Sequence, residues 1–175
     1  MDVGHSCQLF LVSDDLNTDG KTDWVIGDYG TPGGSYSGYV YIFYGGSIIT
    51  ETTSGADVTL TGPGGSAFGQ TVVTGDFNAD GRTDLAAGGR YYGSDTGRVY
   101  IMYNDGSLPT TADTADVMIT GETTSNYFSY AMTAGDMNGD GRTDLIVGAY
   151  GNATNTGKVY FYETRENFAW EIQEQ

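Results

Sequence analysis

The sequence predicts an all-β chain built from three copies of one structural unit, and three observations support this. A nine-residue, aspartate-rich stretch occurs three times, beginning at Asp15, Asp76 and Asp136, so the copies are 61 and 60 residues apart. Short β-branched and aromatic runs lie between turns rich in glycine, of which the chain has 28. No extended segment shows the period of an amphipathic helix.

The repeated stretch has the composition of a calcium loop. Its copies read DLNTDGKTD, DFNADGRTD and DMNGDGRTD, with side-chain oxygens at positions 1, 3, 5 and 9 and glycine at position 6. Ca²⁺ takes six to eight oxygen ligands, and glycine permits the sharp turn that aims them at one point. The predicted ligands are Asp15, Asn17, Asp19 and Asp23; Asp76, Asn78, Asp80 and Asp84; Asp136, Asn138, Asp140 and Asp144; and the backbone carbonyls of Lys21, Arg82 and Arg142, whose side chains are expected to point to solvent.

Two other interpretations of this stretch are weaker. An EF-hand needs a glutamate at position 12 and flanking helices, whereas position 12 here is Ile26, Ala87 or Val147 within a strand-like run. Aspartate and glycine also form simple polar turns, but such turns do not require the same four oxygen positions three times. Calcium is favoured over magnesium because many protein oxygens suit a larger ion. Transition metals would require more than the single histidine and cysteine, His5 and Cys7.

Charge and composition exclude several classes of function. The 175 residues carry a formal net charge of −16, which argues against nucleic acid as a partner. Nine of the 23 acidic residues lie in the predicted loops, so much of this charge is explained by ion ligands. A lone cysteine forms no internal disulfide. No apolar run is long enough to predict a transmembrane segment.

Each unit contains four predicted strands. The first precedes the loop (Gln8–Val12, Gln70–Thr74, Tyr130–Ala134), and the second follows it (Trp24–Ile26, Leu85–Ala87, Leu145–Val147). The third is an aromatic run (Tyr39–Tyr44, Arg98–Tyr103, Lys158–Tyr162), and the fourth is Val58–Thr61, Val117–Thr120 or Phe168–Ile172. The third strands are apolar almost throughout, which indicates that both faces of each sheet are covered.

A four-stranded antiparallel sheet that recurs at this period is typical of a β-propeller blade. We therefore predict three blades, at residues 1–62, 63–121 and 122–175, that form one structural unit. Closed propellers have typically four to eight blades, so three make a partial propeller. Either the chain is a piece of a longer protein or copies of it associate, and we expect that the isolated chain is not a free monomer.

These units resemble the FG-GAP repeats of the integrin α-subunit β-propeller and its bacterial relatives. The family pattern is Phe-Gly, the first strand, Gly-Asp opening the loop, an apolar strand, and Gly-Ala-Pro. The corresponding residues are Phe68-Gly69, Gly75-Asp76 and Gly88-Gly89-Arg90 in the second unit, Phe128-Ser129, Gly135-Asp136 and Gly148-Ala149-Tyr150 in the third, and Cys7-Gln8 and Gly27-Asp28-Tyr29 in the first. The proline is missing from all three units, so this turn is expected to differ from that of the family.

The resemblance covers essentially the whole chain. It implies three structural Ca²⁺ ions and a place in a six- to seven-bladed propeller, with other blades or copies of the same chain as neighbours. It also implies an extracellular or cell-surface location. No catalytic residues are predicted, because the carboxylates are better explained as metal ligands than as general acids or bases.

Three functions remain open for such a module. The first is adhesion or protein interaction, with an unknown protein ligand. The second is carbohydrate binding, as in related fungal lectins, and the third is a structural role in an extracellular assembly. Tyrosines after the second strands either pack between blades or form a recognition surface; they are Tyr29, Tyr36, Tyr91, Tyr92 and Tyr150. The stretch Asn152-Ala153-Thr154 is also a glycosylation sequon.

Overall fold

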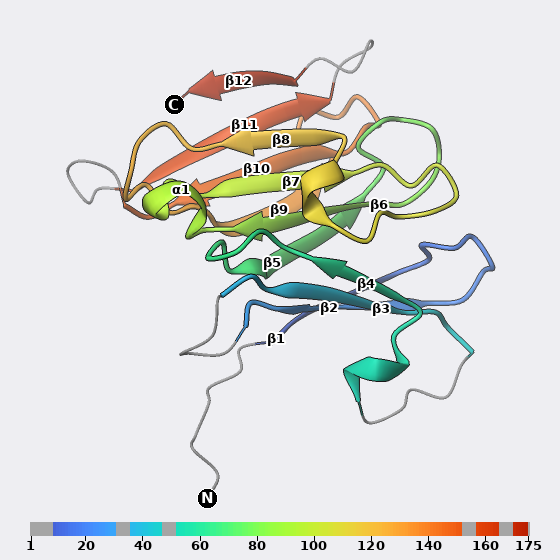
Figure 1. Cartoon of the computed structure of the whole chain (residues 1–175). Coiled ribbons are helices and arrows are strands. Elements are labelled where there is room, and N and C mark those ends of the chain that lie inside the picture. Colours follow the sequence, from blue (N-terminus) through green and yellow to red (C-terminus); the bar gives the residue numbers. More distant parts are fainter. Residues whose placement is uncertain (1–8, 31–35, 47–51, 152–156, 165–169, 175) are drawn as a thin grey trace, which may run out of the picture.

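The chain forms three four-stranded antiparallel sheets in a computed structural model that describes residues 9–30, 36–46, 52–151, 157–164 and 170–174 (Figure 1). Blade 1 contains β1 (Leu9–Asp14), β2 (Asp23–Asp28), β3 (Tyr39–Phe43) and β4 (Val58–Thr61). Blade 2 contains β5 (Phe68–Gly75), β6 (Asp84–Gly89), β7 (Arg98–Met102) and β8 (Val117–Thr120). Blade 3 contains β9 (Phe128–Gly135), β10 (Asp144–Ala149), β11 (Lys158–Thr164) and β12 (Trp170–Glu174). The prediction of an all-β chain with three four-stranded blades is confirmed.

The strands within each blade follow one another in sequence order, each paired antiparallel with the next. Only short helical segments accompany them in the described ranges: η1 (Thr53–Gly55), α1 (Tyr92–Asp95) and η2 (Ala112–Thr114). Of the predicted fourth strands, Val58–Thr61 and Val117–Thr120 are observed with those bounds, and the last one is observed from Trp170 to Glu174, two residues beyond the predicted end at Ile172. Residues 165–169 lie outside the described part of the chain.

The first strands of blades 2 and 3 begin earlier than predicted. The pairing register of β5 with β6 shifts between Phe68 and Thr71, and that of β9 with β10 shifts next to Phe128. Gly69 and Ser129 adopt left-handed backbone conformations within these bulges, with φ of 80° and 72°. Each bulge contains two residues without a partner in the register, which interrupt the regular alternation of side chains, and this explains why the predicted strands started later.

The blades pack face to face with their first strands side by side, because β5 contacts both β1 and β9 (Figure 1). One apolar core lies between blades 1 and 2 and a second lies between blades 2 and 3. Only the middle blade is covered on both faces: all residues of β6 are buried. The outer faces leave Trp24 of blade 1 and Val159 of blade 3 exposed by 39% and 46%. Within this chain both faces are therefore covered in blade 2 alone, as is expected for a partial propeller whose outer blades each have one open face.

Candidate metal sites

The three aspartate-rich loops connect the first and second strands of their blades, and each loop curls around its own first carboxylate. In blade 1 the amides of Asp19 and Gly20 donate to the two carboxylate oxygens of Asp15, at 3.1 and 2.9 Å. The amides at positions 5 and 6 make the same pair of bonds to Asp76 in blade 2 and to Asp136 in blade 3, at the same distances. The three loops therefore share the same conformation.

Positions 3 and 5 continue this pattern of oxygens turned toward loop amides. Asn17 Oδ1 accepts from the amide of Asp19 at 3.0 Å, and Asp19 Oδ1 accepts from the amide of Lys21 at 2.9 Å. These bonds favour the charged form of the carboxylates. The amide of Lys21 is the main cause that lowers the pKa of Asp19, and the amide of Gly141 is the main cause that lowers the pKa of Asp136. The loops thus hold ionised carboxylates in an ordered turn.

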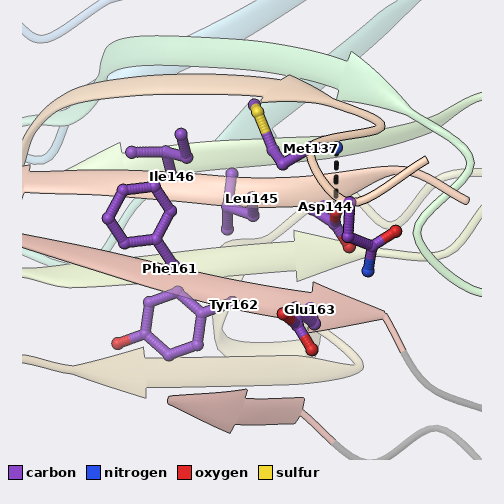
Figure 2. Close-up of a pocket in the computed structure, with 8 residues that line it drawn as sticks. Met137, Asp144, Leu145, Ile146, Phe161, Tyr162 and Glu163 are labelled. Atoms are coloured by element: carbon purple, nitrogen blue, oxygen red, sulfur yellow. Dashed lines mark hydrogen bonds between the residues drawn. The ribbon is translucent and has the colours of Figure 1, made fainter. Parts of the chain in front are cut away.

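The aspartate at position 9 is buried in each loop and clamps the loop to its blade. Asp84 accepts from the amide of Phe77 at 2.9 Å and from the amide of Asn104, just after β7, at 2.7 Å. Burial raises the pKa of Asp84 to about 6, although the two amides act in the opposite direction. Asp144 makes the equivalent bond to the amide of Met137 at 3.0 Å (Figure 2). In this structure position 9 holds the loop in shape.

Two residues of each loop have left-handed backbones. Position 6 is Gly20, Gly81 or Gly141, with φ between 80° and 85°. Position 4 is also left-handed, and it is Thr18 in blade 1, Ala79 in blade 2 and Gly139 in blade 3. The glycine at position 6 is required by this turn, whereas Thr18 and Ala79 adopt a conformation that costs a non-glycine residue roughly 1–2 kcal/mol.

The side chains at positions 1, 3, 5 and 9 of these loops fit the chemistry of a hard cation, since all of them are carboxylates or amides. Among the described residues, however, no group of three or more His, Cys, Asp or Glu side chains is gathered so that it could hold an ion. The carboxylates at positions 1, 5 and 9 each accept from loop amides, and the side-chain ligands predicted for each site lie within one loop.

The side chain at position 7 of blade 1 is exposed, as expected, and it also contacts its own loop. The Nζ of Lys21 lies 3.2 Å from Asp19 Oδ2 and 3.4 Å from the carbonyl of Gly45. In blades 2 and 3 the corresponding oxygen of Asp80 or Asp140 accepts from the asparagine at position 3, at 3.1 and 3.3 Å. Position 5 thus has one oxygen turned to a loop amide and the other to a side chain.

A residue that the sequence did not single out connects two loops. The side-chain amide of Asn104 donates to the carbonyl of Leu16, at position 2 of the first loop, and to the carbonyl of Thr83 at 3.1 Å. Asn104 is only 5% exposed. Its place is taken by Gly45 in blade 1 and Thr164 in blade 3, whose amides also bond the position-9 aspartate. Because these three residues differ in type, no repeated sequence signal marks the position.

The tyrosines predicted on the connections are mostly engaged with one another. Ring centroids lie 6.4 Å apart for Tyr36 and Tyr91, 6.3 Å for Tyr91 and Tyr127, and 4.7 Å for Tyr127 and Tyr150. This row runs across all three blades, which favours packing between blades over recognition. Tyr92 instead lies edge-on to Tyr100 and beneath the guanidinium of Arg98, at 3.7 Å.

Several predicted features fall outside the described residues, namely His5, Cys7, Gln8 and the sequon at Asn152. In the described ranges no helix is long and apolar enough to cross a bilayer.

The sequence is similar to a known repeat family and to several known proteins. The profile of the FG-GAP-like repeat matches residues 15–87 and 76–147. The phosphatidylinositol-glycan-specific phospholipase D of Bos taurus is 35% identical over 154 residues, which cover 79% of this chain and 18% of that protein. Integrin alpha-6 of Gallus gallus is 33% identical over 146 residues, and integrin alpha-11 of Homo sapiens is 30% identical over 141. These matches cover 81% and 71% of this chain, but only 13% and 11% of the integrins. The chain therefore spans less than a fifth of the length of these relatives.

Proposed function

The chain belongs to the FG-GAP-like repeat family, and from this premise we propose that it is a calcium-stabilised, non-catalytic propeller module that interacts with other proteins outside the cell. The observation that carries the calcium assignment is the threefold loop, in which the same hydrogen bonds hold four oxygen-bearing side chains in one turn. A carboxylate oxygen has a second lone pair, so it can bind an amide and an ion together. Three Ca²⁺ would bring the formal charge from −16 to about −10.

The non-catalytic role is supported by the positions of the residues whose pKa values are raised by burial. Besides Asp84, burial raises the pKa values of Tyr100 and Tyr162. Both tyrosines belong to the apolar cores between blades, where their rings support packing. The similarity to a phospholipase D covers 18% of that enzyme, and the same repeats are shared with integrins.

Protein interaction is the better supported of the remaining functions, because two different kinds of protein, a phospholipase D and an integrin, share these repeats. The relatives also support the extracellular location. Carbohydrate binding has a weaker basis, since Tyr91, Tyr127 and Tyr150 pack on one another where a lectin would offer free ring faces to a sugar.

Calorimetric titration with Ca²⁺ tests the proposal, with Mg²⁺ as the control. We expect three ions per chain and a higher melting temperature in Ca²⁺ than in EDTA. At a hundredfold excess over Kd, one site contributes about 2.7 kcal/mol to the free energy of unfolding. Identical melting temperatures in Ca²⁺ and EDTA would contradict the calcium assignment.

A further inference from the structure

Asn104 lies where the aspartate-rich loops of blades 1 and 2 meet; loops 1, 2 and 3 denote these loops in blades 1, 2 and 3. Asn104 follows β7 and is only 5% exposed. Its backbone amide donates to Asp84 Oδ1 at 2.7 Å, and its side-chain amide donates to the carbonyl of Thr83 at 3.1 Å. The same side-chain amide donates to the carbonyl of Leu16. One buried residue therefore holds positions 8 and 9 of loop 2 and position 2 of loop 1.

The backbone at Leu16 carries two of the predicted ion ligands of loop 1, because Asp15 and Asn17 are its chain neighbours. The amide of Leu16 donates to Asp23 Oδ2 at 2.8 Å, and the amide of Asn17 donates to the same oxygen at 3.2 Å. Leu16 is thus held by its own loop through its amide and by blade 2 through its carbonyl. A change in the position of Asn104 would therefore move the backbone that places Asp15 and Asn17.

A second hydrogen bond joins the same two loops. The hydroxyl of Thr83, at position 8 of loop 2, donates to Asp14 Oδ1 at 3.4 Å. Asp14 immediately precedes loop 1, and the same oxygen accepts from the amide of Asp15 at 2.9 Å. Loops 1 and 2 are thus connected by two side-chain hydrogen bonds between blades.

Loops 2 and 3 are close to one another but lack these bonds at the same positions. Thr164 takes the place of Asn104, and its hydroxyl donates to the carbonyl of Thr143 in its own blade at 2.6 Å. Gly75 takes the place of Asp14 and has no side chain that could accept a bond. A Cβ added at Gly75 would lie 2.5 Å from Thr143 Cγ2, so the blades are in close contact here. The two junctions therefore differ in the residues that they present to one another.

We propose that Asn104 is a positioning residue that couples ion binding by loops 1 and 2. Occupation of either loop raises the affinity of the other for Ca²⁺, whereas loop 3 binds its ion independently. This inference rests on the calcium assignment in the proposed function.

The coupling follows from the bonds that Asn104 shares between the loops. When loop 2 is ordered around an ion, Asp84 and Thr83 hold Asn104 in the orientation that meets the carbonyl of Leu16. Loop 1 is then partly ordered before its own ion binds, so less conformational entropy is lost in that step. Coupling between two binding sites acts equally in both directions, so an ion in loop 1 favours binding by loop 2 to the same extent.

A thermodynamic cycle on the full chain tests this coupling. Calorimetric titration with Ca²⁺ gives the binding constants, and Asp19→Ala, Asp80→Ala and Asp140→Ala each inactivate one loop at position 5. The chain with Asp140→Ala alone keeps loops 1 and 2, and it is compared with the double variants that keep only loop 1 or only loop 2. The chain with Asp19→Ala alone keeps loops 2 and 3, and it is compared with its separate loops in the same way.

We expect loops 1 and 2 together to have an overall binding constant at least about fivefold above the product of their separate constants. For loops 2 and 3 the two values should agree within about twofold. Asn104→Thr in the Asp140→Ala chain should lower the ratio for loops 1 and 2 to about twofold or less, because Thr164 shows that this residue bonds within its own blade. Ser107→Ala, at an exposed position of the same connection, should leave the ratio unchanged.

The ratio separates coupling from a purely structural role, because a residue that only stabilises the fold would change the free energy of unfolding and not the ratio. The wild-type Asn104 is present in the comparison of joint with separate loops, so that comparison decides the matter even if Asn104→Thr does not fold.

Three results would overturn the proposal. One is an overall constant for loops 1 and 2 that does not exceed the product of the separate constants. Another is a ratio that survives Asn104→Thr in a folded chain, and the third is an equal ratio for loops 2 and 3. Independent binding of three ions would refute the coupling and leave the calcium assignment intact, whereas a wild-type chain that binds no Ca²⁺ would refute both.

Discussion

The side-chain amide of Asn104 donates a hydrogen bond to the backbone carbonyl of Leu16, which joins blade 2 to the aspartate-rich loop of blade 1. The backbone amide of Asn104 also bonds the buried carboxylate of Asp84 at 2.7 Å. One residue therefore touches two candidate ion sites. In blade 3 the equivalent Thr164 donates to the carbonyl of Thr143, within its own blade, at 2.6 Å. The first and second loops are thus connected in a way that the third does not repeat.

Asn104→Thr introduces the residue that blade 3 has at this place. The free energy of unfolding is expected to fall by about 1–3 kcal/mol, because the buried carbonyl of Leu16 loses its donor. Urea denaturation at constant Ca²⁺ measures this change. Asp105→Asn, at the exposed neighbouring position, should change stability by no more than about 0.5 kcal/mol. An unchanged urea midpoint for Asn104→Thr would show that the hydrogen bond from Asn104 to Leu16 does not contribute to stability.

Gly27→Ala should destabilise the protein strongly, although it adds only one methyl group. The new methyl group would overlap the carbonyl oxygen of Gly69, so blades 1 and 2 must separate. We expect a loss of roughly 3 kcal/mol or more, at the upper end of overpacking effects. Gly148→Ala, the same change at the same position of blade 3, is the matched control and should be nearly neutral. The melting temperatures of the two variants test this prediction. Equal melting temperatures would mean that the contact between blades 1 and 2 relaxes enough to accept the methyl group.

Backbone strain in the loops predicts different effects on stability at positions 4 and 6. Gly81→Ala places a Cβ on a residue with φ of 85° and should destabilise by about 1–2 kcal/mol. Ala79→Gly removes a Cβ at φ of 60°, so the gain offsets the entropy cost of glycine and stability should be unchanged or slightly higher. No heavy atom lies within 4 Å of a Cβ built at Gly81, so this comparison isolates backbone strain from packing. The urea midpoint in EDTA should therefore fall for Gly81→Ala and should not fall for Ala79→Gly.

Asp140→Ala should remove one ion site and leave the other two. Repeats contact mainly their neighbours, and the third loop lacks the link that Asn104 provides between the first two. Calorimetry should therefore report two ions per chain in place of three. Asp113→Ala, a change of the same charge outside the loops, should retain all three. Loss of every site in Asp140→Ala would indicate that the loops bind ions cooperatively.

The sequence by itself determined the features that depend on neighbours along the chain. The three repeats, the twelve strands and the position of each loop follow from patterns a few residues long, because strand alternation and loop curvature are local properties. The fourth strands Val58–Thr61 and Val117–Thr120 have the bounds that were predicted. The side-chain oxygens and the glycine at position 6 of each loop were identified for the same reason.

Only the tertiary structure decided what depends on residues about 60 to 90 positions apart. Asn104 lies 88 residues from Leu16, and nothing in its own surroundings indicates that contact. Val40 and Val159 occupy equivalent places in their repeats, yet Val40 is fully buried and Val159 is 46% exposed. The difference arises because a following blade covers one and not the other. Local pattern specifies a blade, whereas burial depends on what packs against it.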